Sequence, residues 1–530
     1  MTCQKAFCFV IVFIIFIGTV NPVSVPKTDW FDEAQKEIHR SLQLKENTNV
    51  AKNVIIFIGD GMGISTVTAA RILRGQKQGR PGEETVLEFE KFPHVGMSKT
   101  YANDRQTPDS AATATAMLCG EKTNVLALGV NDNVEVSNCS SQIGNELRCI
   151  TDWFEEDGRS AGVVTTTRIT HATPAAAYAK SPNRNWEGDV VMDGYPMEGC
   201  YKDIAYQLVF NSSLKVVLGG GRVFFYPNTT ADPEYDIPAF KRQDGLDLIQ
   251  EWKKKNKYKR SKYVWNKAQF DNVNPAKTSH LLGLFEASHM NYDIDRPYDI
   301  AGEPSLAEMT SKAIKILRKD KKGFFLLVEG GRIDHAHHAN NAIRSLHDVL
   351  AFEDAVKEAV QLTDEKDTLI LVTADHSHVF TMAGYPSRGN DIFGVSDSNV
   401  DVNEVPYTTL SYANGPGYRD GPRNISDVIN STFLDYKQET TVPLRSETHA
   451  GEDVAIYARG PMSHLIHGVH EQHYIAHVMA QAARVGPGAC NKQKNKGKTG
   501  KENKAFKTFL SEKQQKVNSL KKTPVEFKWH

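Results

Sequence analysis

Four short runs of large apolar and β-branched residues constrain the fold of this chain more than any other feature. Turn-forming or charged residues bound them, and they read NVIIFI (53–58), SAGVVTT (160–166), GFFLLV (323–328) and DTLILV (367–372). Continuous apolar runs of this length are typical of strands buried on both faces. Helical patterns lie between them, for example over 305–319 and 342–362. The alternation predicts an α/β fold: a central, mainly parallel sheet flanked by helices on both faces.

Acids and imidazoles follow the carboxyl ends of these runs. The segments that come next are, in order, Gly59-Asp60-Gly61, then Arg168 and His171, then Glu329 to His338, and Thr373 to His378. In open α/β sheets, ligands bind beyond the carboxyl ends of the strands. Acids packed together in a dry cleft need a compensating charge, and mixed Asp/His sets suit zinc. The sequence therefore predicts a metal site at this edge of the sheet.

Two spacings support a shared site. Asp334 and His338 are four residues apart, so they share a face of any helix that begins there. Asp375 and His376 are adjacent on a turn and can approach one ion from two directions. Any one of these residues alone is more often a surface or capping residue. Three acid-rich strand ends in one chain favour the metal site over coincidence.

Asp60 raises a second alternative. The stretch GDGMG (59–63) resembles a dinucleotide-binding loop, but its third glycine is misplaced. No acid closing a second strand stands out about 20 residues further on. Asp60 is better interpreted as a bridging metal ligand, with glycines that allow the backbone to approach the ions.

Ser110 is the candidate nucleophile. It lies in TPDSAATATAMLCG (107–120), after Pro108-Asp109 and before a run of small helix-compatible residues. This pattern predicts a helix N-terminus, where backbone N–H groups favour an anion. A lone serine there is usually a helix cap. Beside a zinc cluster it becomes a nucleophile, because a metal can hold the hydroxyl as an alkoxide.

Seven motifs together give the chain a specific resemblance. In sequence order they are DGMG, PDSAATATA, TRITHATPA, NRNW, EGGRIDHAHH, TADHSH and ETHAGEDVAIYARGP. From about residue 45 to about residue 490 the chain resembles an animal alkaline phosphatase. The resemblance implies hydrolysis of phosphate monoesters to an alcohol and inorganic phosphate, with a phosphoserine intermediate, broad substrate range and alkaline optimum. The alternative is a non-catalytic secreted protein that binds phosphate compounds on the same fold; it would lack a ligand, and none is missing.

The resemblance implies a role for each site residue. Ser110 would accept the phosphoryl group, and Arg184 would clamp two of its oxygens. Two zinc ions and one magnesium ion are implied; their ligands would be Asp334, His338 and His449 for the first zinc, Asp60, Asp375 and His376 for the second, and Asp60, Thr173 and Glu329 for magnesium. His171 would support the water around magnesium, whereas His335 and His378 would lie nearby without binding an ion.

A further cation site, for one calcium ion, is also implied. Its matches are Glu234, the carbonyl of Phe285, Glu286, and Glu303, which stands where relatives often have Asp. Ligands that are all oxygens suit calcium. The alternative is that these are ordinary surface acids.

Five cysteines follow the first 24 residues, an odd number, so at least one is free or pairs between chains. By resemblance, Cys139 and Cys200 match the family's disulfide and Cys119 matches a buried free thiol. The usual partner of Cys490 is replaced by Arg484, which leaves Cys149 as its candidate partner.

The chain divides into four segments. Residues 1–24 have the Lys-flanked apolar pattern of a signal peptide, which predicts secretion, and no apolar tail of the lipid-anchor type is evident. Residues 25–48 resemble a helical arm that embraces a partner subunit, and 49–490 the catalytic domain, with a crown-like insertion at 384–447. A homodimer is expected. Sequons at Asn138, Asn211, Asn228, Asn424 and Asn430 predict N-glycans.

Charge gives few hints of macromolecular partners. The net charge of −1 indicates neither a nucleic acid nor a membrane partner for the whole chain, and no mature transmembrane span is expected. Residues 491–530 differ, with 12 Lys and 3 Glu, and predict a solvated tail able to contact anionic surfaces.

Overall fold

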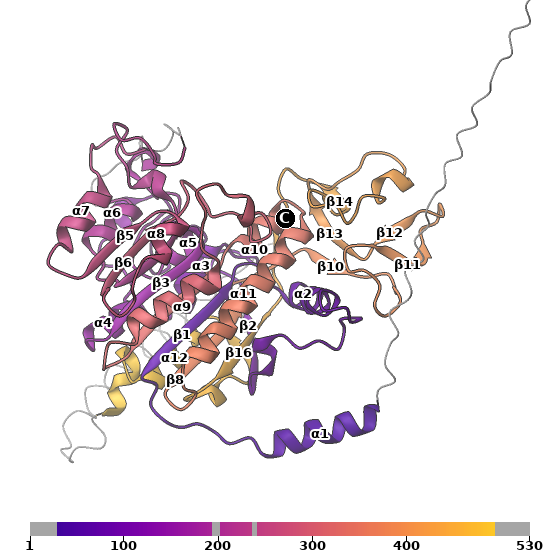
Figure 1. Cartoon of the computed structure of the whole chain (residues 1–530), viewed down its shortest axis with the longest axis horizontal. Coiled ribbons are helices and arrows are strands. Elements are labelled where there is room, and N and C mark those ends of the chain that lie inside the picture. The colour runs from indigo at the N-terminus through magenta and orange to yellow at the C-terminus, as the bar shows by residue number, and fades with distance from the viewer. Residues whose placement is uncertain (1–28, 193–201, 236–240, 493–530) are drawn as a thin grey trace, which may run out of the picture.

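A ten-stranded sheet forms the centre of the computed structural model, which describes residues 29–192, 202–235 and 241–492 (Figure 1). In spatial order the strands are β17 (Gly468–Glu471), β2 (His94–Lys99), β16 (Val454–Arg459), β8 (Thr368–Ala374), β1 (Asn53–Gly59), β7 (Phe324–Gly330), β3 (Ser160–Arg168), β4 (Val216–Gly220), β6 (His280–Leu284) and β5 (Ser261–Val264). Only β16 is antiparallel to its neighbours. The predicted mainly parallel α/β fold is confirmed.

Helices cover both faces of the sheet. Side chains along β1 alternate between two cores, with Val54 and Ile56 facing one and Ile55 and Phe57 the other. The first core is closed by α3 (Ser110–Cys119), α4 (Ile150–Glu156), α5 (Ala172–Ala175), α6 (Ile204–Phe210), α7 (Leu248–Lys255) and α12 (Tyr474–Ala483). The second is closed by α2 (Ile64–Gln76), α8 (Lys267–Asp271), α9 (Leu306–Leu317), α10 (Arg332–His338) and α11 (Ala342–Leu362). Burial on both faces explains why the strands lack polar alternation.

The four apolar runs form four adjacent strands, in the order β8, β1, β7 and β3. They are parallel, and Gly59 at the end of β1 pairs with Gly330 of β7 and Ala374 of β8. The segments after these strands therefore leave the sheet at the same level. This register brings the predicted ligands together.

A smaller group of strands lies apart from the main sheet, near the upper right of Figure 1. It comprises β10 (Phe380–Met382), β11 (Val395–Val400), β12 (Pro406–Thr408), β13 (Leu410–Gly415) and β14 (Thr440–Pro443). The chain enters and leaves this region through β9 (Ser377–His378) and β15 (His449–Ala450), which pair with each other and set His378 opposite His449. The region overlaps the predicted insertion at 384–447.

The cysteine pairing differs from two predictions. Cys119 and Cys149 form a disulfide, with an S–S distance of 2.01 Å. Cys119 is therefore not a free thiol, and the predicted pair of Cys149 with Cys490 is wrong. Cys119 ends α3 and Cys149 is the N-cap of α4, and the two helices pack together, so their ends meet. Cys139 is disulfide-bonded. Its predicted partner Cys200 lies outside the described residues, as does the side chain of Cys490.

The predicted helix near the N-terminus is present as α1 (Trp30–Leu42), and all its residues are exposed. It lies apart from the body of the molecule (Figure 1). The predicted signal peptide (1–24) and most of the predicted tail (491–530) fall outside the described residues. Within those residues, no helix combines the length and the apolarity that crossing a bilayer requires.

Candidate metal centre and nucleophile

Three acids from neighbouring strands meet at the carboxyl edge of the sheet. Asp60 comes directly after β1, Glu329 is the second-last residue of β7, and Asp375 comes directly after β8; all three are fully buried. Burial, together with the charges of Asp375 and Asp334, raises the pKa of Asp60 well above its usual value. Burial also raises the pKa of Glu329 to about 7, although a hydrogen bond from Thr165 opposes the shift. The charge of Arg184 opposes the rise in the pKa of Asp60 but does not cancel it.

Several atoms around these acids are buried with no hydrogen-bond partner. They are both carboxylate oxygens of Asp60, Oε1 of Glu329, Oγ1 of Thr173 and Nδ1 of His171. An unpaired buried polar group costs about 1–3 kcal/mol, and a charged group costs more. A divalent cation would satisfy the carboxylate and hydroxyl oxygens together, because hard cations prefer oxygen ligands. The residues present therefore fit a metal ion, and Asp60, Glu329 and Thr173 are the residues predicted for magnesium.

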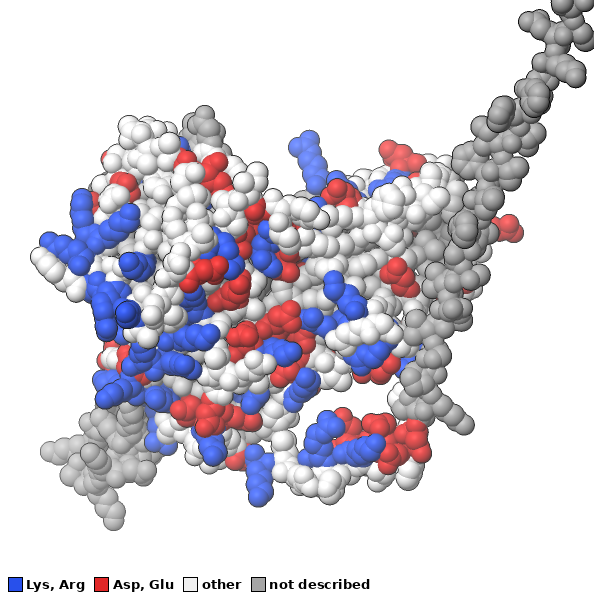
Figure 2. Space-filling view, in the orientation of Figure 1, with Lys and Arg blue, Asp and Glu red and all other residues white. Residues whose placement is uncertain are grey.

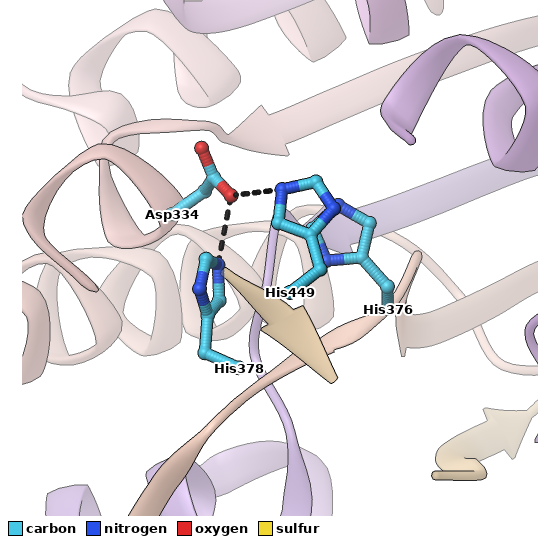
Figure 3. Close-up of side chains that lie close together, drawn as sticks. All are labelled: Asp334, His376, His378 and His449. Atoms are coloured by element: carbon cyan, nitrogen blue, oxygen red, sulfur yellow. Dashed lines mark hydrogen bonds and ion pairs between the residues drawn. The ribbon is translucent and has the colours of Figure 1, made fainter. Parts of the chain in front are cut away.

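A second group combines imidazoles with Asp334, which lies on α10. Figure 3 shows Asp334 with His376, His378 and His449. Oδ1 of Asp334 lies 3.2 Å from Nε2 of His449 and 3.4 Å from Nε2 of His338. The two Nε2 atoms are only 3.2 Å apart. The other ring nitrogens face backbone carbonyls. Nδ1 of His338 lies 2.6 Å from the carbonyl oxygen of Glu447, and Nδ1 of His449 lies 2.8 Å from that of Pro108.

These contacts assign the tautomers. A carbonyl accepts only from an N–H, so both Nδ1 atoms carry the proton and both Nε2 atoms present lone pairs. Two imidazole lone pairs and a carboxylate oxygen then converge on one point. That arrangement is repulsive unless a cation lies between them, and His/His/Asp is a common zinc ligand set. The residues predicted for the first zinc ion thus lie together.

His376 connects this group to the acids. Its Nε2 lies 3.3 Å from Oδ2 of Asp375 and 3.5 Å from Oδ1 of Asp60. The same atom is 3.4 Å from Oγ of Ser110. Its ring stacks on that of His449, with centroids 3.6 Å apart. The residues predicted for the second zinc ion therefore surround the candidate nucleophile.

Ser110 is the first residue of α3 and is buried. The helix is capped by Asp109, whose carboxylate accepts from the backbone N–H of Ala112. Arg184 donates to the other oxygen of Asp109 at 3.0 Å and contacts Nε2 of His171 at 3.0 Å. The guanidinium and the helix N-terminus thus lie on the same side of the serine, where both favour an anion.

Glu447 was not predicted from the sequence, although it stands two residues before His449 in the ETHAGED motif. It lies against His378, which also contacts Asp334; Oε2 of Glu447 is 2.5 Å from Nδ1 of His378, and Oδ1 of Asp334 is 2.7 Å from Nε2. Burial alone would lower the pKa of His378, but the two carboxylates raise it to about 10. A protonated His378 would hold Asp334 in place. His378 also belongs to two groups whose atoms could hold a metal ion, one with Asp334, His376 and His449 and one with His338 and Glu447, so its place near the ions without binding one stays a prediction.

His335 lies on the other side of α10. Its Nδ1 is 3.0 Å from NH1 of Arg332, and its ring is 4.2 Å from that of His289 and 5.4 Å from that of His171. It belongs to none of the metal-type groups among the described residues. That His335 lies near the site without binding an ion stays a prediction.

A separate acidic group lies beside the β6 end of the sheet. Ligand atoms of Glu234, Glu286 and Asp299 lie within 4.8 Å of one another. Phe285, buried beside Glu286, comes directly after β6. Glu303 is buried close by: its Oε1 accepts from the backbone N–H of Asn291, whereas its Oε2 has no partner.

Burial and the charge of Glu286 raise the pKa of Glu303 to about 8. Asp299 was not predicted, because it is one of several acids in a loop without a distinguishing motif. Glu286 and Glu303 are buried, whereas Glu234 and Asp299 are half-buried. With unpaired oxygens on Glu234, Asp299 and Glu303, this acid group fits a calcium ion.

Comparisons with known proteins identify the family. The sequence model of the family "Alkaline phosphatase" matches residues 51–485. Human tissue-nonspecific alkaline phosphatase is 50% identical over 466 residues, which cover 86% of this chain and 88% of the human protein. Alkaline phosphatase of Gadus morhua is 48% identical over 464 residues, which cover 86% of this chain and 97% of that protein.

Solved structures show the same fold. The alkaline phosphatase of Thermus thermophilus matches with a TM-score of 0.60 at 24% identity, over 82% of this chain and 92% of that one. The enzyme of the Antarctic bacterium TAB5 gives a TM-score of 0.58 at 23% identity, over 82% and 99%. Family membership favours an enzyme over the non-catalytic alternative. The chain belongs to the alkaline phosphatase family, and it is an enzyme that hydrolyses phosphate monoesters.

Proposed function

We propose that the enzyme transfers the phosphoryl group of its substrate to Ser110 and then to water. The observation that carries this proposal is the position of the Ser110 hydroxyl, 3.4 Å from Nε2 of His376, at the N-terminus of α3 and beside Arg184. A nucleophile, a cation and a helix N-terminus around one point are the elements of phosphoryl transfer.

The ligand groups support two zinc ions and one magnesium ion. His338, His449 and Asp334 would hold the first zinc. His376, Asp375 and Asp60 would hold the second, and Asp60, Glu329 and Thr173 the magnesium. When bound, such ions lower the pKa of a coordinated hydroxyl or water and neutralise charge on phosphoryl oxygens.

The residues of the chain orient the substrate. Arg184 presents its guanidinium to two phosphoryl oxygens and is itself held by Asp109. The backbone N–H groups at the start of α3 face the same anion. Because these contacts all go to the phosphate, the leaving alcohol is weakly selected. A broad substrate range and an alkaline optimum are expected, since hydrolysis of the phosphoserine needs a deprotonated water.

The test is transfer of label to the protein. The wild-type enzyme incubated with ³²P-labelled phosphate at low pH should carry label on the Ser110 peptide, and Ser110→Ala should carry none. Ser387→Ala, at an exposed position, is the matched control and should label normally. Labelling of the Ser110→Ala protein would show that another residue accepts the phosphoryl group.

We also propose a calcium ion at the separate acidic group. Glu234, Glu286 and Asp299 would be its side-chain ligands, with the Phe285 carbonyl beside them. Glu303, with one unpaired buried oxygen, completes the acid set around the ion.

The features of the surface suit a secreted homodimer. Four of the five sequon asparagines, Asn211, Asn228, Asn424 and Asn430, are exposed, and Asn138 is half-buried. Helix α1 presents Trp30, Phe31, Ile38 and Leu42 to solvent without any buried residue. An amphipathic helix is stabilised mainly by packing of its apolar face, so α1 needs another surface. A second copy of this chain supplies it; deleting residues 29–44 should shift the mass measured by light scattering from dimer to monomer.

A further inference from the structure

A strongly basic segment lies far from the catalytic site. Between residues 251 and 263 the sequence reads EWKKKNKYKRSKY, with seven Lys and Arg and a single Glu. It comprises the last turn of α7, a short loop and the start of β5. Figure 2 shows Lys and Arg side chains gathered on this flank of the molecule, over α7 and β5, with few acids among them.

Most of these cations have no acidic partner. Lys254 pairs with Glu251, and Lys255 donates to backbone carbonyls, including that of Ser212 at 2.7 Å. The other five are exposed, and no carboxylate of the described residues lies within 4.0 Å of them: Lys253, Lys257, Lys259, Arg260 and Lys262. We call these five residues the α7–β5 basic surface.

Neighbouring cations strengthen the positive electrostatic potential at the α7–β5 basic surface. Burial and the nearby charges of Lys259, Lys215 and Lys255 together lower the pKa of His280 to about 4. Lys319 has its pKa lowered by burial and by Arg260 and Lys215. Cations that repel one another in this way are stabilised when an anion binds between them.

The α7–β5 basic surface lies at the amino ends of the parallel strands, whereas the active site lies at their carboxyl ends. Strands β5 and β7 run in the same direction, connected through parallel pairs. The five cations precede β5 or occupy its first residues, whereas Glu329 and Asp334 lie at and beyond the end of β7. The two sites are separated by four strand spacings, about 19 Å, as well as by the length of the strands. A ligand held at the basic surface leaves the active site open.

Protection of the sheet edge does not account for the surface. Strand β5 is an outer strand, and a lysine on such a strand discourages pairing with other chains. Lys262 alone serves that purpose. The remaining four cations lie before the strand begins, on α7 and in the loop, where there is no edge to protect.

We propose that the α7–β5 basic surface binds a linear sulfated polysaccharide and so holds the enzyme on an extracellular matrix with its active site facing outward. Lysine ammonium groups are point charges suited to sulfate, and their spread over a helix end, a loop and a strand fits an extended ligand. The choice of a polysaccharide over a nucleic acid rests on the proposed secretion. Tyr258, 91% exposed and with its ring centroid 4.6 Å from Nζ of Lys257, offers a flat face for a sugar ring.

The experiment measures binding of the full-length enzyme to immobilised heparin across a range of NaCl concentrations. The test variant is K253Q/K257Q/K259Q/R260Q/K262Q. The control variant is K45Q/K91Q/K357Q/K366Q/K437Q, which loses the same charge at exposed positions elsewhere. The test variant should bind about tenfold or more weakly at about 0.15 M NaCl, with a smaller dependence of log Kd on log salt. The control variant should bind as the wild type does. Both variants keep the 12 Lys of the tail, so a loss confined to the test variant assigns binding to this surface.

Other outcomes would overturn the proposal. Equal binding by the test and control variants would assign heparin binding to another part of the chain. Tighter binding of double-stranded DNA, or of vesicles containing phosphatidylserine, than of heparin would identify another class of partner. Inhibition of p-nitrophenyl phosphate hydrolysis by saturating heparin would contradict the placement opposite the active site. Turnover by the unbound enzyme tests the proposed catalysis separately, because no member of the surface belongs to the site.

Discussion

Oε2 of Glu447 lies 2.5 Å from Nδ1 of His378, and both side chains are buried. The other nitrogen of His378 contacts Asp334, so one imidazole connects the carboxylate of Glu447 to that of Asp334, which is proposed as a ligand of the first zinc ion. Carboxylate–histidine pairs of this kind orient metal ligands.

Glu447→Gln should weaken metal binding by about 10- to 100-fold, because an amide cannot keep His378 protonated and Asp334 loses its fixed position. The measurement is a zinc titration of the metal-depleted protein, read both as zinc bound per chain and as recovered activity. Glu404→Gln, on the surface, should leave both curves unchanged. A Glu447→Gln protein with wild-type zinc affinity would show that this contact does not position Asp334.

Arg184→Lys should lower kcat/KM by about a hundredfold, because one ammonium group cannot replace two parallel N–H donors to the phosphoryl group. Inhibition by inorganic phosphate should weaken in the same variant. Arg105→Lys, at an exposed position, is the control. If phosphate inhibition were unchanged, Arg184 would not contact the phosphoryl oxygens.

The disulfide between Cys119 and Cys149 closes a loop of 30 residues. A loop of that size predicts a contribution of about 3–4 kcal/mol to the free energy of unfolding. The C119A/C149A variant should therefore unfold at lower guanidinium concentration than the wild type. Peptide mapping without reduction should recover the two cysteines in one linked fragment; two separate alkylated thiols would contradict the pairing.

Calcium should raise the melting temperature of the wild-type enzyme, since a ligand that binds only the folded state stabilises it. Asp299→Asn removes one of the three converging carboxylates and should reduce this rise. Asp271→Asn, on the exposed end of α8, should keep it. An equal rise in all three proteins would place the calcium-sensitive site elsewhere.

His280 supplies a pH dependence. Burial and the cations Lys259, Lys215 and Lys255 lower its pKa from 6.5 to about 4 in the folded protein. Between pH 6.5 and pH 4 the unfolded chain therefore binds a proton at His280 that the folded chain does not. The contribution of His280 to the free energy of unfolding is full above pH 6.5 and is lost as the pH falls through 4. His280→Gln should flatten the fall in melting temperature over that range.

NMR titration of His280 in the wild type should give a pKa near 4, and Lys259→Gln should raise it. A pKa of 6.5 in both proteins, the ordinary value for histidine, would show that the lysines do not act on the ring.

The sequence by itself determined the sheet and most of the site. Unbroken apolar runs such as 53–58 can be satisfied only by strands covered on both faces, and parallel strands necessarily present their carboxyl ends at one edge. Asp60, Glu329 and Asp375 were therefore predictable from their positions at the ends of these runs. The helix N-terminus at Ser110 was predictable because polar residues before a run of small residues mark a helix start, whereas the role of Ser110 as phosphoryl acceptor was implied by the resemblance to the family.

Only the tertiary structure decided which segments far apart in the sequence contact each other. The disulfide depended on where the end of α3 meets the start of α4, which no spacing along the chain encodes. Glu447 and Asp299 were recognisable only once folding placed them against His378 and Glu286. The same holds for the basic surface: its lysines are contiguous in sequence, but the direction of β5 places them on the edge opposite the active site.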